Sequence, residues 1–121
     1  MELKKTLVLG ASANPARYSC MAIRSLVNKG HPVVGVGLKE EETSGIKIEN
    51  TKIPFEDVDT ITLYLNPQRQ KEYYEYIIAL DPKRVIFNPG TENPELYQLL
   101  RQNGIQVEVA CTLVLLSVNQ Y

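Results

Sequence analysis

Short apolar runs alternate along this chain with segments that have the spacing of amphipathic helices. Residues 6–9 are such a run, ending at Gly10, and apolar character over so few residues is typical of a strand buried on both faces. Strands of this kind occur in parallel sheets that carry helices on both sides. The alternation therefore predicts an α/β domain with a doubly wound, mainly parallel sheet.

The predicted elements follow one another without an internal repeat or a long linker. Strands are expected at residues 6–9, 32–37, 60–65, 84–88 and 105–109, giving a five-stranded sheet in one three-layer domain spanning residues 1–121. Helices are expected at residues 19–29, 67–80 and 94–103. Asn66 is expected to cap the second helix, with Pro67 in its first turn, and Asn93 and Pro94 are expected to start the third. The apolar pattern of residues 111–118 does not separate helix from strand, and a terminal helix packed on the sheet is favoured there. Residues 38–45 are expected to form a polar loop, and residues 46–48 a minor strand or turn.

Composition excludes several classes of partner. The net charge is −1 and no long basic run is present, which argues against nucleic acid, because a phosphate backbone requires clustered Lys and Arg. No apolar stretch approaches the roughly 18 residues of a membrane span. Cys20 and Cys111 lie far apart without metal-ligand spacing, as expected of reduced thiols in a cytoplasmic protein.

The loop after the first strand, "GASANPAR", has features of an anion site. Gly10 allows a sharp turn, Ser12, Asn14 and Ser19 supply short polar groups, and Arg17 supplies a fixed positive charge. The helix that follows presents unpaired N–H groups, which favour an anion. Each residue also has a structural alternative: Ser19 as a helix cap, Asn14 in a turn, and Arg17 in solvent.

The choice of nucleotide depends on the end of the second strand. The first loop lacks the GxGxxG spacing of dinucleotide binders, and Lys39 stands where such proteins place an acid for the ribose hydroxyls. A lysine suits a ribose that carries a phosphate, which favours coenzyme A or NADP over NAD. The alternative is an ordinary surface lysine beside the acidic run of residues 40–42.

The stretch "VLGASANPARYSCMAIRSLVNKGHPVVGVGLK" resembles the start of the small stand-alone CoA-binding proteins, which are related to the Rossmann-like CoA-binding domain of the succinyl-CoA synthetase alpha subunit. The likeness extends along nearly the whole chain. It implies a Rossmann-like fold and a site for coenzyme A or an acyl-CoA. Three departures accompany it: residues 37–39 read Gly-Leu-Lys instead of Asn-Pro-Arg, "FNPGTEN" replaces a glutamine-rich turn, and "TLVLLSVNQY" replaces a polar, acidic ending.

The resemblance also implies roles for particular residues. The phosphate and nucleotide end would be held by Gly10, Ala11, Ser12, Asn14, Arg17 and Ser19, with Lys39 on a phosphate. The adenine side would be lined by Leu65, Asn66 and Pro67, and the mouth of the site would include Asn88 and Gly90. Cys111 matches the cysteine that begins the terminal segment of the family.

Catalysis is not expected from this residue set, and no metal ligands are predicted. His31 is the one histidine, and it precedes the second strand, at the end of the sheet opposite the predicted ligand. The favoured hypothesis is a module that binds coenzyme A or an acyl-CoA through the loop after the first strand. The alternatives are an NADP-binding oxidoreductase-type domain and a degenerate Rossmann-like module for protein interaction. The apolar last segment makes a homodimer or a partner protein a further expectation.

Overall fold

The computed structural model describes residues 2–121, which contain a sheet in the order β3-β4-β2-β1-β5-β6-β7. Its strands are β1 (Thr6–Ala11), β2 (Val33–Gly37), β3 (Glu41–Thr43), β4 (Ile46–Glu49), β5 (Thr60–Leu63), β6 (Arg84–Phe87) and β7 (Gln106–Val109). All neighbouring pairs are parallel except β3 with β4. The predicted α/β class with a mainly parallel sheet is confirmed.

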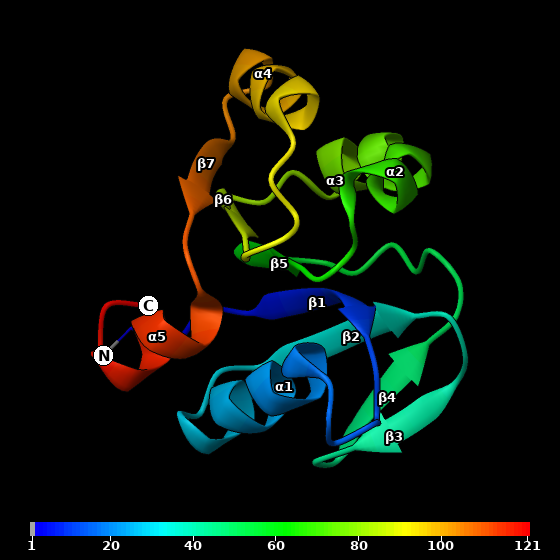
Figure 1. The fold of residues 1–121 in the computed structure, drawn as a ribbon, viewed down its shortest axis with the longest axis vertical. Helices are drawn as coiled ribbons and strands as arrows, with labels where there is room; N and C mark the ends of the chain where they lie inside the picture. The colour runs from blue at the N-terminus through cyan, green and yellow to red at the C-terminus, as the bar shows by residue number, and fades with distance from the viewer. Residues whose placement is uncertain (1) are drawn as a thin grey trace.

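Helices cover both faces of this sheet (Figure 1). The elements α1 (Tyr18–Asn28) and α5 (Thr112–Ser117) lie on one side, and the terminal helix is confirmed. The other side carries α2 (Pro67–Gln70), the short 3₁₀ turn η1 (Lys71–Tyr73), α3 (Tyr74–Leu80) and α4 (Pro94–Gln102). In β1, Leu7 and Leu9 join the core cluster under α3 and α4, whereas Val8 joins the cluster under α1 and α5. Alternation within one buried strand thus supplies two hydrophobic layers.

The prediction of five strands was wrong, because the segment after β2 forms a hairpin. β3 lies in the stretch predicted as a polar loop, and it pairs antiparallel with β4. Ser44 and Gly45 make the tight turn between them, with φ of 54° and 77°. β3 consists of the polar residues Glu41, Glu42 and Thr43, none of them buried, so it lacks the apolar pattern that identifies a buried strand. Ile48 of β4 is fully buried and anchors the hairpin to the core.

The helix predicted after residue 66 is divided into α2, η1 and α3. Asn66 caps its start as expected, with its Oδ1 accepting from the Arg69 N–H at 2.9 Å. Gln70 is buried, and its Nε2 donates to the carbonyl oxygens of Leu65 and Thr91, at 2.8 Å each. These bonds fix the first turn. The 3₁₀ turn η1 follows, and it changes the direction of the chain before α3 begins. In α3, Ile77 is buried in the core.

The order of the strands determines where a crevice forms. From β1 the chain passes through α1 to β2, and from β5 it passes through α2 and α3 to β6, in the opposite direction along the sheet. The connecting helices consequently lie on opposite faces, and they diverge at the carboxyl ends of β1 and β5. Such a switch point is the usual location of a ligand in an open parallel sheet.

We predict that Gly37→Ala destabilises the sheet by about 1–3 kcal/mol, as overpacking generally does. A Cβ at Gly37 would collide with the backbone carbonyl oxygen of Ala11, its partner on β1, and would lie 3.2 Å from the Ile48 side chain. Urea denaturation measures the change in the free energy of unfolding. Gly35→Ala, on the same strand, is the control. Its Cβ would meet side chains, at 3.2 and 3.5 Å, whereas the Cβ at position 37 would meet backbone. Equal losses for the two variants would contradict this account.

Candidate functional site

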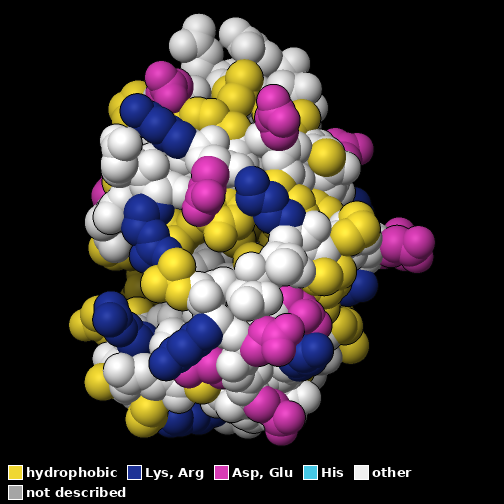
Figure 2. Space-filling model, turned by 90° about the vertical axis from the view of Figure 1, so that its right-hand side faces the viewer, with side chains coloured by type: hydrophobic (Ala, Val, Ile, Leu, Met, Phe, Trp, Pro, Cys, Tyr) yellow, Lys and Arg dark blue, Asp and Glu magenta, His cyan; other side chains and the backbone are white. Residues whose placement is uncertain are grey.

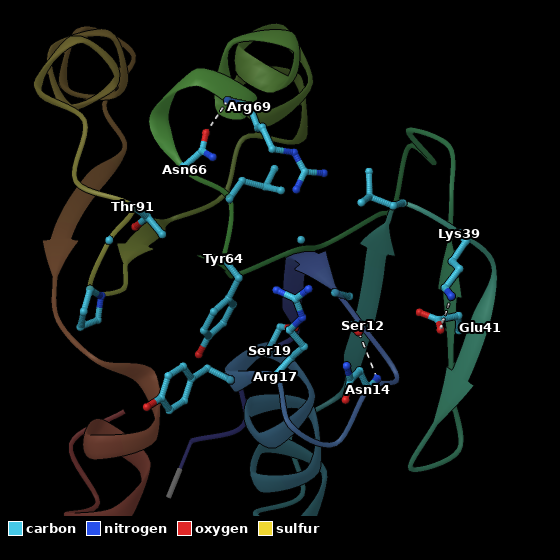
Figure 3. Close-up of a pocket in the computed structure, with 17 residues that line it drawn as sticks. Ser12, Asn14, Arg17, Ser19, Lys39, Glu41, Tyr64, Asn66, Arg69 and Thr91 are labelled. Atoms are coloured by element: carbon cyan, nitrogen blue, oxygen red, sulfur yellow. Dashed lines mark hydrogen bonds and ion pairs between the residues drawn. The ribbon is translucent and has the colours of Figure 1, made fainter.

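A cavity of about 590 Å³ opens at the carboxyl ends of the central strands. Its walls come from the loop after β1 and the start of α1, from the segment between β2 and β3, and from the turns after β5 and β6 (Figure 3). On the space-filling surface this face is hollowed, with hydrophobic side chains in the hollow and Lys and Arg side chains around it (Figure 2). The cavity therefore combines an apolar floor with a charged rim.

Gly10 allows the end of β1 to lie directly against the chain that follows β5. Its φ is +92°, and a Cβ there would come within 3.0 Å of the Tyr64 backbone and 3.1 Å of the Leu65 side chain. Any other residue would meet both an unfavourable backbone conformation and a steric conflict. Gly10 thus brings the first loop and the β5 end together at the cavity.

Short polar side chains shape the loop after Gly10. The Ser12 Oγ accepts from the Asn14 N–H at 3.0 Å, and the Asn14 Oδ1 accepts from the Ala16 N–H at 3.0 Å. The residue that caps α1 is Arg17, not Ser19, and no side chain caps this helix end. The first N–H groups of α1 are therefore not occupied by a capping side chain, and the positive end of the helix dipole lies at the cavity.

Two guanidinium groups point into the cavity from different elements. Arg17 extends from the start of α1 and Arg69 from α2, and both reach toward the centre of the cavity (Figure 3). Both residues are exposed, and neither has an ion-pair partner among residues 2–121. The cavity thus has two forked cationic donors, suited to phosphate or carboxylate groups.

Lys39 also lines the cavity, but an acidic residue accompanies it. The Lys39 Nζ lies 3.7 Å from the Glu41 Oε1. The other Glu41 oxygen, Oε2, accepts from the Ala13 N–H at 3.2 Å, in the loop after β1. One carboxylate therefore connects the start of β3 to the first loop across the cavity wall.

Most residues singled out in the sequence surround this one cavity. They are Gly10, Ala11, Ser12, Asn14, Arg17, Ser19, Lys39, Leu65, Asn66 and Gly90. Pro67 does not line it, because it forms the first turn of α2 directly behind the Asn66 cap. Asn88 does not line it either.

Asn88 is buried beneath the cavity and joins three elements. Its Nδ2 donates to the Thr62 Oγ1 at 2.6 Å and to the Leu63 carbonyl oxygen at 2.8 Å, both on β5. Its Oδ1 accepts from the Thr112 N–H of α5 at 2.8 Å. Both Nδ2 donor positions and the Oδ1 atom of this amide are bonded to protein groups, so Asn88 has a structural role.

Several lining residues were missed in the sequence. They are Tyr18, Leu38, Glu41, Tyr64, Arg69, Pro89 and Thr91. Arg69 had a local signal, because it lies one helical turn after the predicted cap Asn66, but its direction toward the first loop depends on the fold. Glu41 had no such signal, because its hairpin was not predicted. Burial raises the pKa of the Tyr64 phenol well above its usual value, so this hydroxyl remains protonated and able to donate a hydrogen bond.

His31 lies at the opposite end of the sheet, as predicted. It is buried, its Nδ1 accepts from the Lys4 N–H at 2.9 Å, and its ring packs 4.9 Å from that of Tyr121. Burial, with a further contribution from the Lys4 charge, lowers the pKa of His31 below its usual value. Neither Cys20 nor Cys111 lines the cavity. Across the described part of the chain, no group of three His, Cys, Asp or Glu side chains could hold a metal ion.

The doubly wound sheet and the crevice at its switch point define a Rossmann-like domain with a candidate site for a small ligand. Residues 4–117 match a family model described as "CoA binding domain", and the chain belongs to this family. No helix within residues 2–121 has both the length and the apolar character needed to cross a membrane. A comparison with curated proteins gave no match.

Three of the similar solved structures share this fold over at least four fifths of their own length. A crystal structure described as an uncharacterized protein is 49% identical, with a TM-score of 0.97 and coverage of 100% of both chains. A hypothetical protein from Pyrococcus horikoshii OT3 is 29% identical, with a TM-score of 0.82 over 93% of this chain and 81% of that one. A protein from Thermus thermophilus is 26% identical, with a TM-score of 0.81 over 98% of this chain and 91% of that one.

We predict that Asn88→Ala lowers the free energy of unfolding by about 2–3 kcal/mol, because a buried polar group left without its partner is costly. The substitution would leave the Thr112 N–H without its acceptor and the Leu63 carbonyl oxygen without a donor. Urea denaturation is the measurement. Asn103→Ala is the matched control, since the Asn103 Nδ2 makes one exposed bond, to the Leu99 carbonyl oxygen. A loss for Asn88→Ala no larger than for the control would refute the structural role.

Proposed function

We propose that this protein binds coenzyme A or an acyl-CoA in the cavity at the carboxyl ends of β1 and β5, and that it acts as a binding module. The observation that carries the proposal is the pair of guanidinium groups, Arg17 and Arg69, directed into one cavity without ion-pair partners among the described residues. Coenzyme A carries a pyrophosphate and a ribose 3′-phosphate, so it offers anionic groups to both arginines. Membership of the CoA binding domain family supports this choice.

The loop after β1 is proposed to hold the phosphates. Gly10 and Ala11 line the cavity at the end of β1 and are proposed to lie beside the phosphates, where the uncapped start of α1 favours an anion. The Ser12 Oγ already accepts a hydrogen bond, so its hydroxyl hydrogen is left to donate to a phosphate oxygen. Ser19 and Arg17, at the start of α1, complete this phosphate side.

The remaining parts of the ligand would contact the other walls. Leu65 and Asn66 are proposed to line the adenine side, and Gly90 the mouth toward the pantetheine arm. Lys39 is proposed to meet the ribose 3′-phosphate. Pro67 and Asn88 would contribute indirectly, the first by starting α2 and the second by joining β5, β6 and α5. The cavity of about 590 Å³ lies within the usual range for ligand pockets, roughly 300–1,000 Å³.

The proposed setting is a reducing one, the cytoplasm, in agreement with the two free cysteines, Cys20 and Cys111. We also propose that residues 1–121 form a single domain. Val109 on the edge strand β7, Val114 on α5 and Val118 just after α5 are each more than half exposed, which supports the expectation of a homodimer or a partner protein.

We predict that Arg17→Ala weakens coenzyme A binding by about tenfold to a hundredfold, because a charge-assisted hydrogen bond to phosphate is lost. Isothermal titration calorimetry with coenzyme A measures it, with NADP, NAD and ATP as competing candidates. Arg24→Ala is the matched control, because Arg24 is exposed on the same helix and outside the cavity. Absence of heat with every nucleotide would refute the proposal, and a preference for NADP would favour the oxidoreductase-type alternative.

We predict that Arg69→Ala also weakens coenzyme A binding, by about fivefold or more, since its guanidinium group faces the same cavity. Arg69→Lys should restore only part of the affinity, because lysine lacks the planar fork. Arg101→Ala, an exposed arginine in the last turn of α4, provides the control. Unchanged affinity in Arg69→Ala would place the phosphates on the Arg17 side alone.

A further inference from the structure

The Glu41 carboxylate lines the cavity and contacts one group on the first loop and one on the segment between β2 and β3. Glu41 lies at the start of β3, and its side chain is 22% exposed. Its Oε2 accepts from the Ala13 N–H at 3.2 Å, and its Oε1 lies 3.7 Å from the Lys39 Nζ. Figure 3 shows Glu41 and Lys39 side by side at the edge of the cavity.

Both partners of Glu41 are groups that favour phosphate. Ala13 belongs to the loop after β1, between Ser12 and Asn14, and its N–H is one of the loop's backbone donors. Lys39 is the cation proposed to meet the ribose 3′-phosphate. Within the described part of the chain, Glu41 is the acidic residue that lines this cavity. A carboxylate at this position therefore satisfies, within the protein, a donor and a cation that a ligand phosphate also requires.

The hairpin makes displacement of this carboxylate feasible. β3 is the outermost strand of the sheet, and β4 is the one strand with which it pairs. A change in the Glu41 side chain, or a small shift of β3, therefore leaves the pairing of β1 with β2 and β5 intact. The Ala13 bond and the Lys39 pair lie at a partly exposed site, so each contributes only modestly to the stability of the hairpin.

We propose that Glu41 is a specificity-determining residue of this site: its carboxylate competes with the ribose phosphate of the ligand for the Ala13 N–H and the Lys39 ammonium group. The proposal rests on the function proposed above. As a consequence, Glu41 lowers the affinity of the protein for coenzyme A. It also lowers the ratio of the affinity for coenzyme A to that for dephospho-CoA, which has a free ribose 3′-hydroxyl. The carboxylate thus determines how much the 3′-phosphate contributes to the binding affinity.

The test compares Glu41→Gln with the wild-type protein by calorimetric titration with coenzyme A and with dephospho-CoA. Removal of one like charge at a partly exposed site should tighten coenzyme A binding by about fivefold. Dephospho-CoA binding should change by less than about twofold, because that ligand places no phosphate against the carboxylate. Glu42→Gln is the matched control, since Glu42 is the exposed neighbour on β3 and does not line the cavity. Equal tightening for both ligands, or none for coenzyme A, would overturn the proposal.

A second measurement uses the wild-type protein, so its result does not depend on the stability of a variant. The amide ¹H–¹⁵N resonance of Ala13 in the wild-type protein should shift when coenzyme A is added, as its partner changes from carboxylate to phosphate. The same resonance should shift in Glu41→Gln without ligand and stay unchanged in Glu42→Gln. An Ala13 resonance unmoved by saturating coenzyme A would also overturn the proposal.

The two proposals fail in different ways. If the wild-type protein binds neither coenzyme A nor dephospho-CoA, the proposed function fails and the role of Glu41 fails with it. If the wild-type protein binds coenzyme A and Arg17→Ala weakens that binding, while Glu41→Gln leaves the affinity unchanged, only the role of Glu41 is refuted.

Discussion

The central position of β1, paired in parallel with both β2 and β5, is the constraint on which the rest of the structure depends. Because each parallel connection requires a crossover, the helices attached to β1 and β5 lie on opposite faces of the sheet and diverge at its carboxyl end. Gly10 and Gly37 then allow the ends of these strands to approach more closely than side chains would permit. The cavity is the space left where the crossovers separate.

Some of the positive charges in this cavity have an acidic partner within the protein, and others are available to a ligand. Arg17 and Arg69 are left without ion-pair partners among residues 2–121, whereas Lys39 is matched by Glu41. An open cationic pair favours phosphate, and a matched pair favours it less, because a new anion must share the lysine with the carboxylate. The β3–β4 hairpin, which brings Glu41 to the wall, therefore bears on ligand preference as well as on the width of the sheet.

Much of the fold could be predicted because local signals and burial agree in the central elements. The strands β1 and β6, the Asn66 cap and the helix start at Asn93 and Pro94 were visible in the sequence, and a helix was favoured for the segment that forms α5. The hairpin was missed because β3 is defined by hydrogen bonds to β4 and has no buried face. The division of the helix after Asn66 was missed because it depends on the buried bonds of Gln70, which connect it to residue 91.

The candidate site divides in the same way. Along the chain, the sequence by itself determined the loop from Gly10 to Ser19, since glycine, short polar residues and an arginine before a helix are local features. It also determined that the ends of the parallel strands would share one edge. Only the tertiary structure decided that Arg69 and Glu41 line the same cavity as this loop, and that Asn88 joins β5 to α5. Those relations join segments 20 or more residues apart, and they are set by strand order and side-chain packing, which no local pattern specifies.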